Sequence, residues 1–371
     1  TTTSDSETAL SITGFDEDAF RKVLKRGVPV IVACLKRYDS IQKVASFFSG
    51  WFEELNIKSF VIDDEGDQAS LNNAKDKENF DSATYGTICK LKDSLCDPLY
   101  FSVTATPQAN IFLDNISRLI PSSIHLLYPA PGYCGADVYH LDEPTQVTTS
   151  DDDFEDCLER NVSPDSLKIA IRHFIIASAL LTTRKTKHKS DMVIHAKKEI
   201  VYHEEIANWV EAYLNDLTSV LEDAVQGDSE AAIALFEPVY ERYFDEAAIK
   251  DQPFDEHFIG MLYDVIRETT VVLQNSKDKK TKSSTLMFSH RINVGADLLQ
   301  RGITFDQLLT TYFVRWSKSG GNMDTNLQRA RWFGYRRAYF DLTRLFTTEE
   351  IAQEFSYLGD MEDDLWTQMQ E

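Results

Sequence analysis

Strands and helices alternate over the first hundred residues, and this pattern constrains the fold more than any other feature. Residues 28–33 (VPVIVA) form an apolar run of the kind found in buried strands, and helical spacing follows over residues 39–55, with Asp39 as the expected N-cap. A second strand, a helix and a third strand are then predicted at residues 60–62, 82–95 and 99–103. Such alternation is typical of a parallel sheet, so we expect an α/β fold.

The second predicted strand ends in a dense acidic cluster. Residues 61–70 read VIDDEGDQAS, with four acidic residues among the five positions 63–67. Because ligands of open α/β sheets bind beyond the carboxyl ends of the strands, Asp64-Glu65-Gly66-Asp67 has the form of the acidic box of a nucleoside triphosphatase. In such a box one carboxylate holds Mg²⁺ through water and its neighbour polarises the attacking water. A solvated acidic turn is the alternative interpretation.

Composition indicates an ordinary globular protein. The chain has 371 residues, 43% of them hydrophobic, which is enough for two domains or more. The sequence contains neither an apolar stretch of membrane-spanning length nor a signal-peptide pattern, so we expect a cytoplasmic protein without membrane contact. Its five cysteines are widely spaced without C-x-x-C, which predicts free thiols.

The formal net charge of -22 limits how the chain can meet DNA or RNA. Long-range electrostatics would repel nucleic acid, so any surface that binds it must be local. Two basic runs are candidates, at residues 184–189 (RKTKHK) and 277–282 (KDKKTK). The alternative is that both are solvated loops.

The amino-acid composition changes around residues 129–164, where Pro and Gly residues precede an acidic run. This pattern predicts a linker or exposed crossing segment, so we place a first domain at residues 1–150 and a second at 151–371. The second domain is expected to carry a helical insertion at about 199–270. Its predicted helices are 165–183, 203–224, 229–248, 254–269 and one from about 348; its predicted strands are 192–195, 271–273, 285–288 and 311–314.

Two further segments carry side chains that suit nucleotide coupling. Thr104 and Thr106 follow the third strand and are placed to hydrogen-bond the carboxylate of Glu65 or Asp67. Residues 295–304 (GADLLQRGIT) set Asp297 and Arg301 one helical turn apart before Gly302. The alternative for this second segment is a helical ion pair with a glycine C-cap.

An arginine-rich segment lies near the carboxyl end. Residues 324–337 (DTNLQRARWFGYRR) contain four arginines beside three aromatic residues. An arginine presented to a γ-phosphate raises turnover by roughly three to five orders of magnitude. The alternative is an aromatic core helix with solvated arginines.

In this order, the acidic box, the T-A-T-P turn, the A-D-x-x-x-R-G-I segment and the Q-x-x-R-W-F-G-Y-R segment resemble motifs II, III, V and VI of superfamily 2 helicases, which have two RecA-like lobes. Within that superfamily the chain is most similar to proteins with the Z-one domain, often labelled an endonuclease domain and found with bacterial restriction and phage-defence genes. The matching residues are 62–70, 104–111, 132–135, 192–195, 301–304 and 331–336.

The resemblance implies two RecA-like lobes with parallel sheets and an ATP-driven DNA translocase or helicase-like subunit of a restriction or phage-defence system. Its cofactors would be ATP and Mg²⁺, and its partners DNA, most simply double-stranded, and other defence-system subunits.

The resemblance also assigns roles to residues. Asp64 would hold Mg²⁺ and Glu65 would polarise the attacking water, while Asp64, Glu65 and Arg331 would bind the nucleotide. Arg331 and Arg336 are the arginine-finger candidates, and Gln328 would contact nucleotide or orient water. The residues expected to couple nucleotide state to movement are Asp67, Thr104, Thr106, Asp297, Arg301 and Gly302.

The sequence departs from this family pattern in two places. Gln328 precedes Arg331 by three residues, where four is usual, and Gln300 stands where serine is more common. The arginine-finger segment therefore matches the family motif less closely than the acidic box does.

The phosphate loop of such motors, G-x-x-x-x-G-K-[ST], does not occur before residue 63. We therefore expect it upstream of Thr1 in a longer protein, and we expect this chain alone to be inactive. The endonuclease label has little support, since E-x-K and Q-x-K are absent and neither His195 nor His290 has a second histidine at metal-ligand spacing. A metal-dependent endonuclease domain and a non-catalytic DNA- or partner-binding scaffold remain the alternatives.

Overall fold

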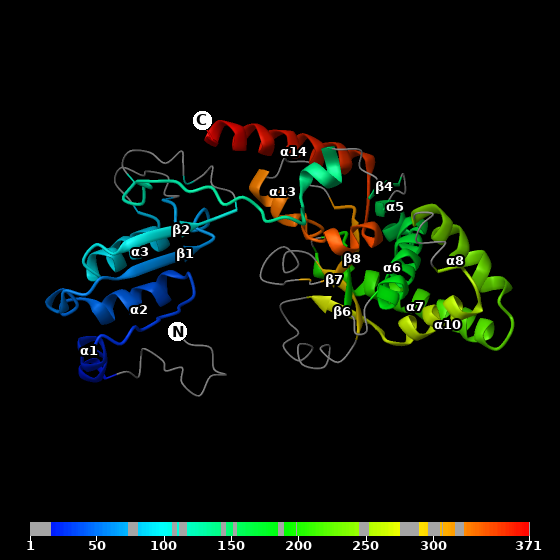
Figure 1. Cartoon of the computed structure of the whole chain (residues 1–371), viewed down its shortest axis with the longest axis horizontal. Helices are drawn as coiled ribbons and strands as arrows, with labels where there is room; N and C mark the ends of the chain where they lie inside the picture. The colour runs from blue at the N-terminus through cyan, green and yellow to red at the C-terminus, as the bar shows by residue number, and fades with distance from the viewer. Residues whose placement is uncertain are drawn as a thin grey trace. The chain divides into compact units, whose positions relative to one another are not determined.

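A computed structural model shows an α/β protein made of two compact units, residues 1–127 and 128–371 (Figure 1). The described residues are 16–72, 81–105, 110, 117–141, 146–150, 154–184, 189–197, 199–244, 252–274, 289–295, 305, 307–315 and 323–370. We expected the boundary at residue 150, whereas the two units divide between Leu127 and Tyr128. The reason is that residues 128–150 contribute two strands, β3 (Tyr133–Cys134) and β4 (Val147–Thr149), to sheets of the second unit.

The first unit packs helices against one face of a parallel strand pair. Its elements are α1 (Glu17–Lys25), α2 (Tyr38–Phe48), a 3-10 turn (Glu53–Leu55), β1 (Phe60–Asp64), α3 (Ala83–Ser94) and β2 (Leu99–Val103). β1 and β2 pair from Phe60↔Leu99 to Asp64↔Val103, so the two strands end at the same level. The core beneath them consists of Phe20, Ile41, Val44, Ala45, Phe48, Trp51, Phe52, Ile88, Leu91 and Leu95.

The other face of this strand pair is apolar and open to solvent. Its side chains are Phe60, Ile62, Leu99, Phe101 and Val103, all of them exposed, and Ile62 reaches 73%. The rings of Phe60 and Phe101 stack with centroids 6.2 Å apart. Parallel strands are normally covered on both faces, so this apolar sheet face is unusual.

Three expectations for the first unit are wrong. Residues 28–33 are not a strand: no described strand pairs with them, and Ile31 is 94% exposed. The helix expected at 39–55 ends at Phe48, because the C-cap Ser49 is extended, with ψ 131°, and Gly50 follows with φ +88°. Its N-cap is Arg37, so Asp39 lies in the first helical turn rather than at the cap.

The second unit contains most of the chain. Its helices are α5 (Phe154–Glu159), α6 (Asp165–Arg184), α7 (Ile200–Val225), α8 (Glu230–Tyr243), α10 (Glu256–Arg267), α13 (Met323–Arg329) and α14 (Glu349–Gln370), with a π-helical turn (Asp137–Leu141) and a 3-10 segment (Arg337–Leu342). Its strands, besides β3 and β4, are β5 (Ser190–His195), β6 (Thr269–Gln274), β7 (His290–Gly295), β8 (Leu308–Phe313), β9 (Gly334–Tyr335) and β10 (Arg344–Thr347).

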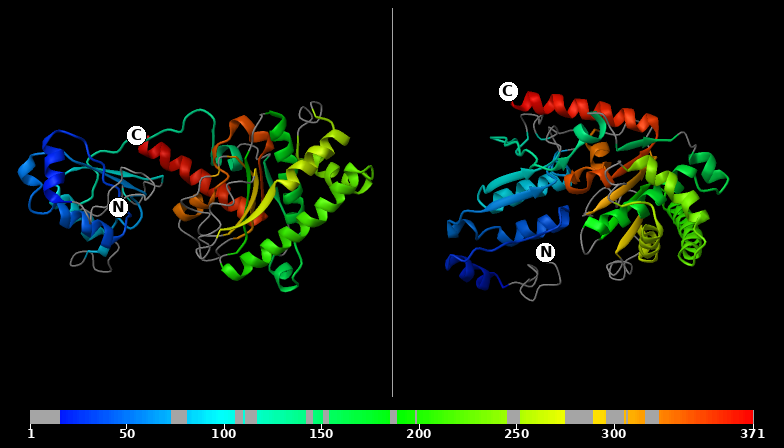
Figure 2. Two further views of the ribbon diagram at one scale, coloured as in Figure 1. Left: turned by 90° about the horizontal axis from the view of Figure 1, so that it is seen from below. Right: turned by 45° about the vertical axis from the view of Figure 1, so that its right-hand side comes forward.

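Six of these strands form one parallel sheet in the order β4-β10-β8-β5-β7-β6. Figures 1 and 2 show strands of this sheet beside the helices of the second unit. Every residue of β5 and β8 is buried, as expected for central strands covered on both faces. α6 packs on β8 and against α8 and α10. By length and composition α6 would suit a membrane span, but most of it is buried inside the unit, which is the property of a core helix.

Helices occupy the range in which we expected a helical insertion into the second unit. α7, α8 and α10 lie in sequence between β5 and β6, within the predicted range of about 199–270. The expected linker at 129–164 is wrong, because β3, β4 and α5 occupy much of it. The strand predicted at 285–288 and the basic run 277–282 lie outside the described residues, and β7 begins at His290.

A buried ion pair fixes the register of β5 and β7. Asp191 is 1% exposed, and Arg291 donates to its two carboxylate oxygens over 2.9 and 2.7 Å. Asn293 donates to Asp191 Oδ1 over 3.0 Å. Asp191 and Arg291 are the second residues of their strands, away from the carboxyl ends where ligands bind, so we assign this cluster to the stability of the sheet.

Candidate functional site

The acidic turn, residues 64–67, begins where β1 ends. Glu65 has φ +55°, the left-handed conformation that non-glycine residues adopt at a cost. The amide of Gly66 donates to the carbonyl of Val103 over 2.9 Å, and the amide of Gln68 donates to the carbonyl of Glu65 over 2.9 Å. These bonds close the turn against the end of β2.

Gly66 is required by this close approach to β2. A Cβ atom at this position would lie 1.8 Å from Ser102 Oγ and 3.0 Å from Ser102 Cβ. Asn110 Nδ2 donates to the same Ser102 hydroxyl over 2.9 Å, which restrains its rotation. A side chain at position 66 would therefore require the Ser102 side chain to shift.

Thr104 contacts the acidic turn from the end of β2. Its hydroxyl donates to Asp67 Oδ1 over 2.7 Å, one of the contacts expected from the sequence. Thr106, the second threonine of that expectation, lies outside the described residues.

A cluster of Lys36, Asp63 and Tyr100 lies at the base of the acidic turn. Asp63 is 8% exposed; its Oδ1 is 2.8 Å from Lys36 Nζ, and its Oδ2 accepts from the Tyr100 hydroxyl over 2.5 Å. Burial and this hydrogen bond raise the pKa of Tyr100 above its ordinary value. Sequence reasoning missed Lys36 and Tyr100; the available signal was a lysine at the end of the apolar run 28–35.

The side chains of Asp64 and Glu65 face solvent. Within the described residues neither carboxylate makes a hydrogen bond or ion pair, and no group of three or more His, Cys, Asp or Glu side chains could hold a metal ion. Mg²⁺ usually keeps several waters and binds one or two carboxylates together with phosphate oxygens. Asp64 and Glu65 present two solvent-facing carboxylates, the number that such an ion takes from a protein.

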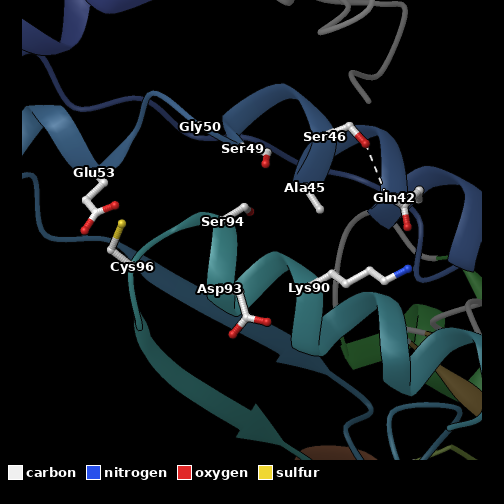
Figure 3. Close-up of a pocket in the computed structure, with 10 residues that line it drawn as sticks. All are labelled: Gln42, Ala45, Ser46, Ser49, Gly50, Glu53, Lys90, Asp93, Ser94 and Cys96. Carbon is white, nitrogen blue, oxygen red and sulfur yellow. Dashed lines mark hydrogen bonds between the residues drawn. The ribbon is translucent and has the colours of Figure 1, made fainter. Parts of the chain in front are cut away.

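The first unit also has a groove between α2 and α3 (Figure 3). Its volume is about 340 Å³, and Glu53, Lys90 and Asp93 supply its charged side chains. None of the predicted site residues lines it. We therefore do not connect this groove with nucleotide chemistry.

In the second unit, Arg336 is buried within the arginine loop, residues 329–337. It is 5% exposed and donates from Nε to the carbonyl of Trp332 over 2.7 Å. Its Nη2 donates to the carbonyl of Arg331 over 2.9 Å, and its Nη1 donates to the Tyr339 hydroxyl over 3.0 Å. In this conformation the guanidinium holds the loop together, a structural task that the finger prediction did not include.

Arg331 and Gln328 are half-buried and lie around the end of α13. The Arg331 guanidinium lies over the Phe305 ring, 5.9 Å from its centroid. Burial, with a smaller contribution from Arg336, lowers the pKa of Arg331. Of the two arginines, Arg331 is the more exposed, whereas Arg336 is enclosed by the carbonyls of its own loop.

Two segments that carry the family resemblance lie together. β3, from the segment 132–135, pairs with β9 of the arginine loop, with Tyr133 opposite Tyr335 and Cys134 opposite Gly334. The two tyrosine rings meet edge to face at 5.5 Å. The short antiparallel pair therefore fixes one side of the arginine loop.

His195 ends β5 and is 2% exposed. Burial, followed by the nearby cations Arg315 and Arg329 and by His203, lowers the pKa of His195 to about 3. Its Nε2 therefore accepts from Arg315 Nη1 over 3.1 Å. We expected a core or surface histidine here, and it is a core one; sequence reasoning missed Arg315 and did not connect Arg329 with His195.

The remaining predicted coupling residues, Asp297, Arg301 and Gly302, lie outside the described residues, as does Gln300. They follow β7 directly in the sequence. The run 184–189 is described only at its ends, where Arg184 closes α6 and pairs with Asp341.

Comparison with known proteins gives one family. Residues 166–371 match the Z1 domain, the Z-one domain of the resemblance, and this match covers more than half of the chain. It includes the six-stranded sheet apart from β4, and the arginine loop, whereas the acidic turn precedes it. No curated protein and no solved structure matches the chain. The chain belongs to the Z1 domain family.

Proposed function

We propose that the chain forms most of an ATP-driven DNA translocase or helicase-like subunit of a cytoplasmic restriction or phage-defence system. The observation that carries this proposal is the Thr104–Asp67 hydrogen bond, which joins the segments that resemble motifs II and III at one end of a parallel strand pair. That end is where open α/β sheets bind their ligands.

Each residue of the acidic turn has a task in this proposal. Asp64 would hold Mg²⁺ through water, and Glu65 would take the proton of the attacking water. The ion, when bound with ATP, would neutralise charge on the phosphate oxygens. Asp67 and Thr104 would pass the state of the turn to β2.

The second unit would supply the cation for the γ-phosphate. Arg331 is the candidate, with Gln328 close to it in sequence, and Arg336 would act by keeping the loop in shape. The parallel sheet of this unit is compatible with a RecA-like lobe, and two such lobes are part of the proposal. DNA would have to bind at a local basic surface, because the net charge is -22.

Intrinsic nuclease activity is the weaker alternative. The described residues hold no cluster of three potential metal ligands, and the buried carboxylate Asp191 is paired with Arg291. A non-catalytic scaffold is the remaining alternative. It predicts no nucleotide hydrolysis in any form of the protein.

The test is DNA-stimulated ATP hydrolysis by the longest natural form of the protein, since the phosphate loop is absent from this chain. Glu65→Gln should lower turnover by at least roughly two orders of magnitude while a non-hydrolysable ATP analogue still binds. Glu53→Gln, at an exposed glutamate in the same unit, is the control. Ordinary hydrolysis by the Glu65→Gln protein would remove this residue from the mechanism.

A further inference from the structure

One lysine ammonium reaches the base of the acidic turn at three points. Lys36 Nζ lies 2.8 Å from Asp63 Oδ1 and donates to the carbonyl of Glu65 over 2.5 Å and to Ser70 Oγ over 3.2 Å. Lys36 stands 29 residues before Glu65 in the sequence. A single cation therefore ties together the residues on both sides of Asp64.

The same contacts separate the four acidic residues into two groups. Asp63 is neutralised by Lys36 and hydrogen-bonded by Tyr100, and Asp67 is hydrogen-bonded by Thr104. Asp64 and Glu65 face solvent. Neutralising Asp63 reduces the repulsion between neighbouring carboxylates that would otherwise oppose this turn.

The contact with Glu65 is made to its backbone and not to its carboxylate. The Glu65 carbonyl accepts from both Lys36 Nζ and the amide of Gln68, while φ at this residue is +55°. A non-glycine residue holds this conformation only when its surroundings impose it. The ammonium supplies a charged hydrogen bond at the strained residue itself.

We propose that Lys36 is a positioning residue for Glu65. By holding the Glu65 carbonyl, it fixes the left-handed turn that points the Glu65 carboxylate away from the core. Its consequence for catalysis rests on the proposed function, whereas the positioning is a property of this chain alone.

The experiment compares three variants of this chain by hydrogen exchange at the amides of Gly66 and Gln68, which donate to Val103 and Glu65. Lys36→Met leaves Asp63 buried without its cation, so it should lower the melting temperature. Lys36→Met combined with Asp63→Asn removes both charges and should recover most of that loss. Asp63→Asn alone keeps the lysine available to Glu65 and Ser70.

If Lys36 positions Glu65, the double variant should recover its melting temperature but should not recover slow hydrogen exchange at the two amides. The two amides should exchange at least about ten-fold faster than in the wild type although the melting temperature has recovered. Asp63→Asn alone should keep them slow. Lys92→Met is the matched control. Lys92 Nζ lies 5.7 Å from the centre of the Tyr100 ring, and Lys92 makes none of the contacts with the acidic turn that Lys36 makes.

Protected Gly66 and Gln68 amides in the double variant would overturn the proposal, because Lys36 would then serve only to neutralise Asp63. In the longest natural form of the protein, the double variant should lower kcat for ATP hydrolysis with KM for ATP little changed. If the wild-type protein hydrolyses no ATP, the proposed function fails. The exchange result still decides the role of Lys36.

Discussion

The hydroxyl of Thr104 donates to Asp67 Oδ1 over 2.7 Å and so joins β2 to the acidic turn that follows β1. The two residues are 37 positions apart in the sequence. The bond links the adjacent ends of two strands, so a displacement of one strand end would displace the other.

Replacing Thr104 by Val should destabilise the first unit. The substitution keeps the shape of the side chain and removes the hydroxyl, which should cost about 1 kcal/mol of the free energy of unfolding. Thr104→Ser retains the donor and should cost less. Urea unfolding followed by tryptophan fluorescence measures both, and equal stabilities for the Val and Ser variants would show that the bond contributes nothing.

Gly66→Ala should distort the acidic turn, because its Cβ would lie 1.8 Å from Ser102 Oγ. We expect a loss of about 1–3 kcal/mol. Adding Ser102→Gly should restore part of it. Gly260→Ala is the control, since nothing lies within 4 Å of its Cβ position and alanine favours the helix. A Gly66→Ala protein as stable as the wild type would contradict the close approach.

Arg336→Ala should lower the melting temperature of the second unit. It would leave the carbonyls of Arg331 and Trp332 and the Tyr339 hydroxyl without this donor, at a cost of about 3 kcal/mol. Arg337→Ala, at an exposed neighbour, should change the melting temperature little. An unchanged melting temperature for Arg336→Ala would contradict a stabilising role for Arg336 and leave the arginine-finger role as the remaining hypothesis for this residue.

The second unit should lose stability as the pH falls below about 6.5. Burial lowers the pKa of His140 to about 4, and burial together with Arg315, Arg329 and His203 lowers the pKa of His195 to about 3, from an ordinary value of 6.5. Between these values and 6.5 the unfolded chain binds more protons than the folded one. The free energy of unfolding therefore falls by up to ~1.4 kcal/mol per pH unit for each histidine.

His140→Gln tests this pH dependence. Glutamine can still accept from Trp332 Nε1, which donates to His140 Nε2 over 3.2 Å. Urea unfolding between pH 7 and 5 should show a shallower slope for this variant. His257→Gln, at an exposed histidine, should keep the original slope.

The sequence predicted most elements whose pattern is local. α3, β2 and α6 lie within a residue or two of their predicted limits, and α14 begins within a residue of its predicted start, because consecutive residues carry both their apolar spacing and their ends. Residues 28–33 have an equally apolar pattern but form no strand among the described residues, since a strand also needs a partner. The same reason explains why β4 and β10 were missed: each is short and is fixed by its neighbours in the sheet.

The candidate site divides in the same way. The acidic turn and the Thr104 contact follow from strand ends that the sequence predicts. Lys36 was missed because its three contacts are distant in the sequence. Asp63, the nearest of its partners, is 27 residues away, and Ser70, the farthest, is 34 residues away. The task of Arg336 was missed because Gly334, with φ +147°, turns the loop so that its carbonyls face the guanidinium.

The apolar sheet face of the first unit has a consequence for the behaviour of the chain in solution. At low ionic strength the net charge of -22 keeps molecules apart. Salt screens that repulsion, while sulfate strengthens the attraction between exposed apolar side chains such as Ile62 and Phe101. Light scattering should therefore show a second virial coefficient that turns negative at a lower concentration of ammonium sulfate than of sodium chloride, although the protein is strongly acidic.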